Sequence, residues 1–232
     1  RPSEWAEERL VWAKTFFPYV PVQMNNSCLG VPRRYANLKT DILMLDDYLT
    51  NGEGRDVAGV VDNIDVLLKA DDAKPCGFFL VCDNMTLHYR SPTYAEQVAQ
   101  SWGVICSGGT LVSWYIGFPN LAGSWRGMVD VNREAQLFAP VILSEELAGQ
   151  SACSADWRNG IRHLTRKYKG AWYVFSVNLY AGAMKQVTFT LPADAPQNGT
   201  VQVAGEHRSL ELKNGRFTDD FAGHTRRIYR IK

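Results

Sequence analysis

The chain has 232 residues, of which 46% are hydrophobic and 21% charged, a balance typical of a packed globular protein rather than a disordered one. The formal net charge of +1 gives no electrostatic argument for a nucleic acid or an anionic membrane as partner. The sequence contains no run of about eighteen apolar residues, so it predicts no membrane-spanning helix.

The cysteine pattern indicates neither a disulfide framework nor a zinc site. The five cysteines are an odd number, and no two of them form a CxxC pair. No G-x-G-x-x-G motif follows a predicted strand. We therefore expect no metal and no cofactor. Triplets of the form Asn-x-Ser/Thr begin at Asn25, Asn84 and Asn198. They act as glycosylation acceptors only in a secreted protein, so a secreted or extracytoplasmic location is a hypothesis.

Residues 1–17 predict a helix on which Trp5, Leu10, Val11 and Phe17 share an apolar face. The chain enters this helix abruptly and does not begin with Met. We expect the sequence to start partway through a larger fold, with a cleaved propeptide as the alternative.

Short apolar strands alternate with helices up to about residue 150. The expected strands are 19–24, 42–45, 77–82 and 110–119, and the expected helices are 57–72, 91–108 and 128–147, the last ending or breaking near Pro140. Continuous apolar strands with helical crossovers are typical of a parallel sheet. Two α/β architectures fit, an open doubly wound sheet and a piece of a (β/α)8 barrel. Polar residues follow the strands, at the edge where barrel active sites are built.

The pattern changes after residue 150 to alternating strands with turns at Lys169-Gly170, Asn198-Gly199 and Asn214-Gly215. This predicts an antiparallel β-sandwich over 151–232, following a barrel region over 1–150. Residues 177–192, VNLYAGAMKQVTFTLP, predict a hairpin around Ala181-Gly182-Ala183. The charges at 219–220 and 226–227 are interpreted as turn and edge-strand charges.

Several stretches resemble the C-terminal part of retaining (β/α)8-barrel glycoside hydrolases. TDILMLDDY is similar to their sixth strand, AEQVAQSWGVICSGGTLVSWYIGFP to the seventh helix and eighth strand, and NREAQLFAPVILSE to the last barrel helix. The stretch VAGEHRSLELKNGRFTDDFAGHTRRIYRIK resembles the closing sandwich strands, ending on an edge. The resemblance implies that strands five to eight are present. It also implies that the N-terminal half of the barrel is supplied by the same precursor or by another chain, because half a barrel leaves its edge strands unpaired.

Glycosidic cleavage requires two carboxyl groups, and the resemblance implies that the nucleophile ends the seventh strand, at Asp83. The resembled enzymes usually have Glu there, and the acid would follow the absent fourth strand. Asp83 is alternatively a loop carboxylate that caps a turn. Asp46 and Asp47 end the sixth strand, and alternation lets only one of them face the barrel mouth. Asp46 is the second catalytic candidate and would form an all-aspartate pair with Asp83. The alternative role for Asp46 is to cap a helix or a loop.

The candidate substrate-binding residues are aromatic or polar side chains near the strand ends. Aromatic rings stack on sugar faces, and aromatic residues make up 12% of the chain. The candidates are Tyr48, Asn84, His88, Trp114 at the end of the last strand, and Trp125 in the loop beyond it. Trp114 is alternatively a packing residue against the last helix, and His88 a solvated loop residue.

The resulting hypothesis is part of a glycoside hydrolase that acts on an oligo- or polysaccharide, with carbohydrate as its ligand. One alternative is a non-catalytic carbohydrate-binding or structural protein with a degenerate barrel. Another is an open α/β domain of unrelated function. A carboxylate at the end of the missing fourth strand would favour the glycoside hydrolase, and its absence would favour the non-catalytic protein.

Overall fold

The computed structural model describes residues 2–26, 40–50, 57–83, 90–115, 119–146 and 148–232. The first part consists of α1 (Pro2–Phe16), β1 (Gln23–Asn26), β2 (Ile42–Asp46), α3 (Gly59–Ala70), β3 (Cys76–Val81), α4 (Tyr94–Cys106), β4 (Leu111–Tyr115) and α5 (Ala122–Ile142). The second part consists of β5 (Ala152–Cys153), the 3-10 turn η1 (Trp157–Asn159), β6 (Ile161–Tyr168), β7 (Ala171–Asn178), β8 (Met184–Thr190), β9 (Gly199–Val203), β10 (Arg208–Leu212), β11 (Arg216–Phe221) and β12 (Arg226–Ile231). Within these ranges, the helices are all too short or too polar to cross a bilayer.

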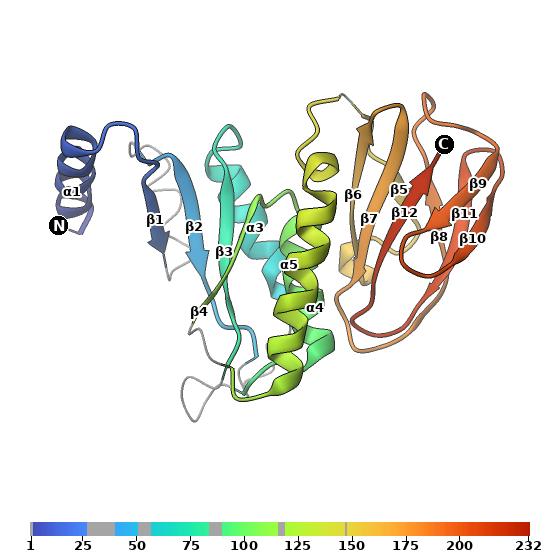
Figure 1. The fold of residues 1–232 in the computed structure, drawn as a ribbon, viewed down its shortest axis with the longest axis horizontal. Helices are drawn as coiled ribbons and strands as arrows, with labels where there is room; N and C mark the ends of the chain where they lie inside the picture. The colour runs from blue at the N-terminus through green and yellow to red at the C-terminus, as the bar shows by residue number, and fades with distance from the viewer. Residues whose placement is uncertain (1, 27–39, 51–56, 84–89, 116–118, 147) are drawn as a thin grey trace.

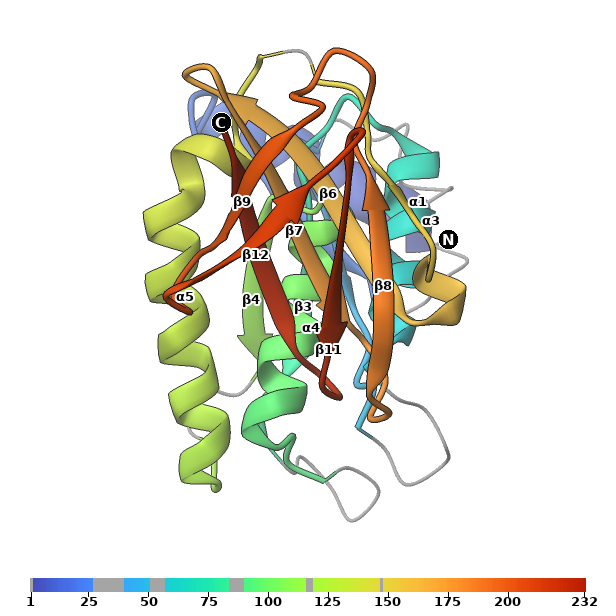
Figure 2. The same ribbon diagram turned by 90° about the vertical axis from the view of Figure 1, so that its right-hand side faces the viewer.

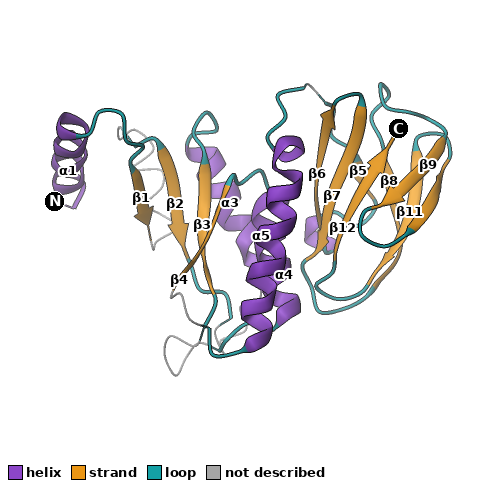
Figure 3. Cartoon of the chain, viewed as in Figure 1, coloured by secondary structure: helices purple, strands orange, loops and turns teal. Residues whose placement is uncertain are grey.

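The first part is a parallel sheet in the order β1-β2-β3-β4 (Figure 1). Its strands all run in the same direction, as the sequence predicts for strands joined by helical crossovers. Figure 3 shows α3, α4 and α5 between this sheet and the antiparallel strands. Alternation divides the strand residues between two faces. Leu43, Leu45, Phe78 and Leu80 belong to the core beneath the helices, so the residues between them face the opposite side, called here the inner face.

Helix α5 begins at Ala122, earlier than the predicted start at residue 128, and continues through Pro140 to Ile142. Trp125 therefore lies in the helix and not in a loop, which corrects the sequence interpretation. The glycines of this segment suggest a loop, but Gly127 has a packing role. A β-carbon there would lie 2.9 Å from Gln97 Cβ, so glycine allows α5 to approach α4 closely.

The predicted apolar face of α1 is wrong. Leu10 is buried, whereas Trp5 and Val11 are 62% and 53% exposed. Figure 1 shows α1 beyond β1, at the end of the molecule away from the antiparallel strands. Helical spacing identified the helix but could not show which of its sides is covered.

The second part contains two antiparallel sheets, in the orders β10-β9-β12-β7-β6 and β11-β8-β5. Their facing sides share an apolar core that includes Trp172, Phe189, Phe217 and Tyr229. Residues 177–192 do not form the predicted hairpin, because β7 pairs with β6 and β12 while β8 belongs to the other sheet. The segment instead carries the chain from one sheet to the other. Alternation alone gives no information about the pairing partner.

Two interpretations of the closing strands are also corrected. Strand β12 is central, between β7 and β9, and is not an edge. Asp219 lies on β11 with 8% exposure and is not a turn charge. Arg226 forms an ion pair with Glu134 of α5, which links the antiparallel part to the helices.

One core connects the parallel sheet, the helices and the five-stranded sheet. Trp102 of α4 is fully buried and stacks on Phe175 of β7, with ring centroids 5.9 Å apart and planes 13° apart. The helices are therefore packed on both sides, which holds the parallel sheet in a fixed relation to the sheets that follow it.

His163 on β6 makes the stability of the antiparallel part depend on pH. Its Nε2 donates to the carbonyl of Ser151 at 2.7 Å, and its ring packs edge-on against Phe189. Burial lowers the pKa of His163 below its usual value of 6.5. Below about pH 6.5 the unfolded chain takes up a proton that the folded chain does not, so the free energy of unfolding should fall by up to about 1.4 kcal/mol per pH unit.

Urea unfolding between about pH 7 and about pH 5 measures this effect. His163→Gln should flatten the dependence in that window, because glutamine keeps a donor but does not titrate. An unchanged slope in the variant would assign the pH dependence to other groups.

Candidate active site

Three polar side chains meet at the carboxyl ends of β1 and β2 on the inner face. Asp46 is the last residue of β2, and its Oδ2 accepts hydrogen bonds from Asn25 Nδ2 at 2.9 Å and from the Tyr48 hydroxyl at 3.3 Å. The other carboxylate oxygen, Oδ1, is shielded from solvent and has no hydrogen-bond partner among the described residues. The group is therefore a carboxylate held by two neutral donors, with one oxygen still able to accept.

Asp47 faces the opposite way. Its Oδ2 accepts a hydrogen bond from Asn63 Nδ2 of α3 at 3.2 Å, so its side chain lies toward the helices. Alternation allows only one of two adjacent strand residues to face the mouth, and that residue is Asp46.

An aromatic pair lies beside Asp46. The rings of Tyr48 and Tyr115, the last residue of β4, have centroids 5.4 Å apart and planes 30° apart. Tyr115 is 42% exposed, so part of its ring is available to a ligand. The sequence analysis did not select Tyr115, although the alternation that separates Asp46 from Asp47 also separates Trp114 from Tyr115.

Trp114 packs on the helix side of the sheet, against the core shared with α3 and α4. Its indole N–H donates to the Gln97 amide oxygen of α4, in the amide orientation that satisfies the surrounding donors and acceptors. Trp114 therefore lies apart from the Asp46 group and has a packing role, although its hydrogen-bond partner is on α4 and not on the last helix. Trp125 is 50% exposed within α5.

Asp83 follows β3 by two residues, and its carboxylate joins two loops. Its Oδ1 accepts hydrogen bonds from Ser91 Oγ at 3.0 Å and from the backbone N–H of Asn120 at 3.2 Å. Ser91 leads into α4 and Asn120 into α5, so Asp83 fixes both helix entrances relative to β3. Asn84 and His88 lie outside the described residues.

A buried polar network supports the end of β3. The Val81 carbonyl accepts from Gln100 Nε2 at 2.8 Å, and the Cys82 carbonyl accepts from Ser124 Oγ at 2.9 Å. Gln97 bridges them, since its Nε2 lies 3.2 Å from Ser124 Oγ and 3.3 Å from the Val81 oxygen. Gln97, Gln100 and Ser124 are fully buried. These bonds fix the direction in which the chain leaves β3 toward Asp83.

Gln100→Leu should lower the free energy of unfolding by about 2 kcal/mol, because it removes the closer donor to a buried carbonyl. Urea unfolding of the complete protein measures the loss. Gln136→Leu, an exposed glutamine on α5, is the matched control and should have little effect. Equal effects of the two variants would contradict a supporting role for the network.

The start of α4 is fixed in the same region. Thr93 caps the helix, accepting from the Glu96 N–H while the Glu96 carboxylate accepts from the Thr93 N–H. A hydrogen bond from Arg90 is the main cause that lowers the pKa of Glu96 to about 2, so its carboxylate stays charged at neutral pH. Within the described residues, no three His, Cys, Asp or Glu side chains lie close enough together to hold a metal ion.

Solved structures align with nearly the whole chain. An α-amylase from Anoxybacillus aligns over 99% of this chain and 56% of its own, with a TM-score of 0.63 and 14% identity. An α-amylase from Geobacillus thermoleovorans, in complex with acarbose, aligns over 100% and 57%, with a TM-score of 0.64 and 12% identity. A putative α-galactosidase from Bacteroides fragilis aligns over 98% and 51%, with a TM-score of 0.60 and 8% identity.

The chain has the fold of the C-terminal part of a (β/α)8-barrel glycoside hydrolase. This confirms the predicted half barrel, strands five to eight, followed by antiparallel sheets. The chain spans about half the length of the solved structures it matches. No protein-family model matches the sequence, and no curated protein matches it either.

Proposed function

We propose that the chain is part of a glycoside hydrolase that cleaves glycosidic bonds in an oligo- or polysaccharide. The observation that carries the proposal is the Asp46 carboxylate, held by Asn25 and Tyr48 at the carboxyl edge of the parallel sheet. Active sites of (β/α)8 barrels are built at this edge. The aromatic pair beside it offers a surface for a sugar ring. The solved structures that share the fold carry carbohydrate-processing names, which supports the same substrate class.

In the proposed mechanism Asp46 and Asp83 are the two catalytic candidates of this chain. A carboxylate that accepts hydrogen bonds from fixed donors is oriented toward the reacting bond, as a nucleophile or general base requires. Asp46 meets this condition directly. Asp83 is held by Ser91 and the Asn120 backbone, and the oriented carboxylate would act from the end of the neighbouring strand. A spacing of about 5–5.5 Å between the two catalytic carboxyl groups would give retention of configuration, and about 6.5–9.5 Å inversion.

The proposed substrate contacts extend outward from these carboxylates. Tyr48 and Tyr115 form the aromatic surface nearest to Asp46. Two further candidate contacts, Asn84 and His88, follow Asp83 in the sequence. The half-exposed Trp125 of α5 is a third. Trp114 takes a packing role in this proposal.

The proposal includes four further barrel strands, from the same precursor or from another chain. Among the described residues, β1 and β4 each have a single neighbour in the sheet, so each offers an unpaired edge. Helix α1 also exposes large apolar side chains, with Trp5, Trp12 and Phe16 at 62%, 56% and 63%. Exposed apolar surface of this kind marks a contact with another element. In this proposal, residues 151–232 form a stabilising cap.

A non-catalytic carbohydrate-binding protein is the second candidate, and the identity and contacts of Asp83 favour it. The resembled enzymes usually have Glu at this position, and the Asp83 carboxylate is engaged by two loops. The shorter side chain retracts the reacting oxygen, and a misplacement of about 1 Å can cost about a hundredfold in rate.

A panel of aryl glycosides, assayed with the complete protein, tests the proposal. Turnover of one of them is expected, and Asp83→Asn should reduce it at least about a hundredfold if Asp83 is the nucleophile. Unchanged turnover would remove Asp83 from the mechanism and leave Asp46. Saccharide binding without turnover would favour the second candidate, and neither binding nor turnover would contradict both.

A further inference from the structure

A groove of about 740 Å³ lies between the second half of α5 and the five-stranded sheet, within the size range of ligand-binding pockets. Figure 2 shows α5 along one side of the sheet that contains β9, β12, β7 and β6. The sheet face that bounds the groove is the one turned toward the helices, since Phe175 and Ile228 on that face belong to the core shared with them. The groove is therefore the part of this face that the helices leave open.

A polar row crosses the open part of the sheet. Tyr173 of β7 pairs with Arg230 of β12, Arg230 with Gln202 of β9, and Gln202 with Ser209 of β10. All four line the groove. Paired residues of adjacent strands project on the same side, so the phenol, guanidinium, amide and hydroxyl form one continuous line of hydrogen-bonding groups.

One guanidinium, that of Arg230, gives the groove its positive charge. Arg208 also lines the groove, and no carboxylate does. Arg208 is paired with Asp219 and Glu206, and its register partner Val203 belongs to the core between the two antiparallel sheets, so its guanidinium lies on the other side of the sheet. Arg230 has no carboxylate partner among the described residues, and its Nε is shielded from solvent without a hydrogen bond. An unpaired guanidinium in a groove without acids favours a ligand that carries a carboxylate.

The opposite wall of the groove is apolar. Leu137, Phe138, Pro140 and Val141 of α5 form it, and Leu137 is 73% exposed. Tyr168, at the end of β6, adds an aromatic ring to the lining. A ligand that fits must therefore have a polar edge for the sheet and an apolar face for the helix. Sugar rings present this combination of hydroxyl edges and C–H faces.

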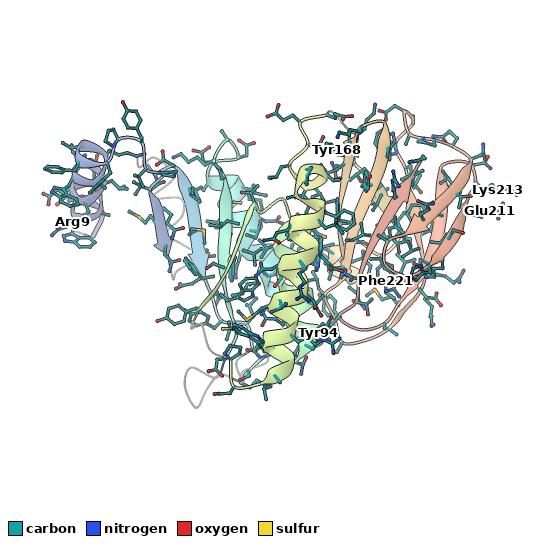
Figure 4. All side chains as sticks on the ribbon, viewed as in Figure 1. Arg9, Tyr94, Tyr168, Glu211, Lys213 and Phe221 are labelled. Atoms are coloured by element: carbon teal, nitrogen blue, oxygen red, sulfur yellow. The ribbon has the colours of Figure 1, made fainter. Side chains whose placement is uncertain are left out.

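We propose that this groove binds an acidic oligosaccharide, with the carboxylate of a uronate residue on Arg230. Gln202 and Ser209 bind hydroxyl groups, and Tyr168 with the α5 wall covers the apolar ring faces. Figure 4 shows Tyr94 and Tyr168 near opposite ends of α5, the former near its start. Because α5 starts beside the strand ends and finishes at the groove, this site is separate from the Asp46 group. It does not depend on hydrolysis by the chain.

Calorimetric titration of the complete protein with an oligogalacturonate, and with a neutral oligosaccharide of the same length, tests the proposal. The acidic ligand should bind at least about tenfold more tightly than the neutral one. Arg230→Gln should weaken binding of the acidic ligand at least about tenfold. Arg216→Gln, an exposed arginine on β11 outside the groove, should leave the affinity unchanged. Gln202→Ala provides a second groove variant, and it should also weaken binding.

Five results would overturn the proposal. The first four are no binding, equal affinity for the neutral ligand, equal losses in the Arg230 and Arg216 variants, and equally tight binding of inorganic polyphosphate. Loss of binding in Asp46→Asn with retention in Arg230→Gln would place the ligand at the strand ends and also overturn it. Retained binding in Asp46→Asn supports the groove, whatever the outcome of the hydrolysis assays.

Discussion

Asp46→Asn is expected to lower kcat/KM of the complete protein about a thousandfold on the glycoside it cleaves, within the range for loss of a group that acts on the reacting bond. The substitution keeps the size and shape of the side chain, so Asn25 and Tyr48 retain a partner. It removes the negative charge that the transition state requires. Steady-state kinetics with an aryl glycoside, together with melting curves to verify folding, measure the effect.

Asp47→Asn is the matched control, because it makes the same chemical change one residue further along the chain. The Asp47 side chain lies toward Asn63 of α3, on the other side of the sheet. Its kcat/KM should therefore stay close to that of the unmodified protein. Comparable losses in the two variants would show that charge near the strand end, and not the position of Asp46, determines activity.

Asp219→Ala should lower the free energy of unfolding by about 3–5 kcal/mol, the cost of removing one partner of a buried ion pair. The Asp219 carboxylate accepts two hydrogen bonds from Arg208, at 3.0 and 2.7 Å, and one from the Tyr229 hydroxyl at 2.9 Å. Asp219 belongs to the three-stranded sheet, and both donors belong to the five-stranded sheet. The variant leaves the Arg208 guanidinium with Glu206, from the turn before its own strand, and the Tyr229 hydroxyl without its acceptor, so it loosens the two sheets from each other.

Asp220→Ala provides the control for this prediction. Asp220 is adjacent in sequence, but its side chain is 44% exposed and pairs with Lys185 at 2.9 Å on the surface. Surface pairs of this kind contribute little, so urea unfolding should show little change. Similar destabilisation by the two variants would contradict the assignment of the buried network to Asp219.

The sequence predicts the parallel part of the fold well, because its signals are local. Apolar runs of strand length and helical spacing both depend on neighbouring residues. The turns at Asn214-Gly215 and Lys169-Gly170 follow the same logic, since all four residues have positive φ. The expected helix start at Ser91 is two residues early, because the N-cap of α4 is Thr93. Strand partners are not local, so the sequence could not show that residues 177–192 change sheets or that β12 is central.

The sequence locates the candidate site at the strand ends but does not show which side chains face the barrel mouth. Alternation shows that Asp46 and Asp47, or Trp114 and Tyr115, face opposite ways, but not which member faces the mouth. The phase is set by the helices, which cover Leu43, Leu45 and Trp114. The contacts of Asp83 with residues eight and 37 positions away depend on loop paths that no local pattern encodes.

A crystal structure of the complete protein with bound saccharide tests the central claim most directly. The account predicts a sugar ring against Tyr48 and Tyr115, with an Asp46 oxygen about 3–3.5 Å from the anomeric carbon. It also predicts that β1 and β4 pair with further parallel strands to close a barrel. A complex in which no saccharide binds at the carboxyl ends of β1–β4, or a sheet that stays open at both edges in the complete protein, would contradict it.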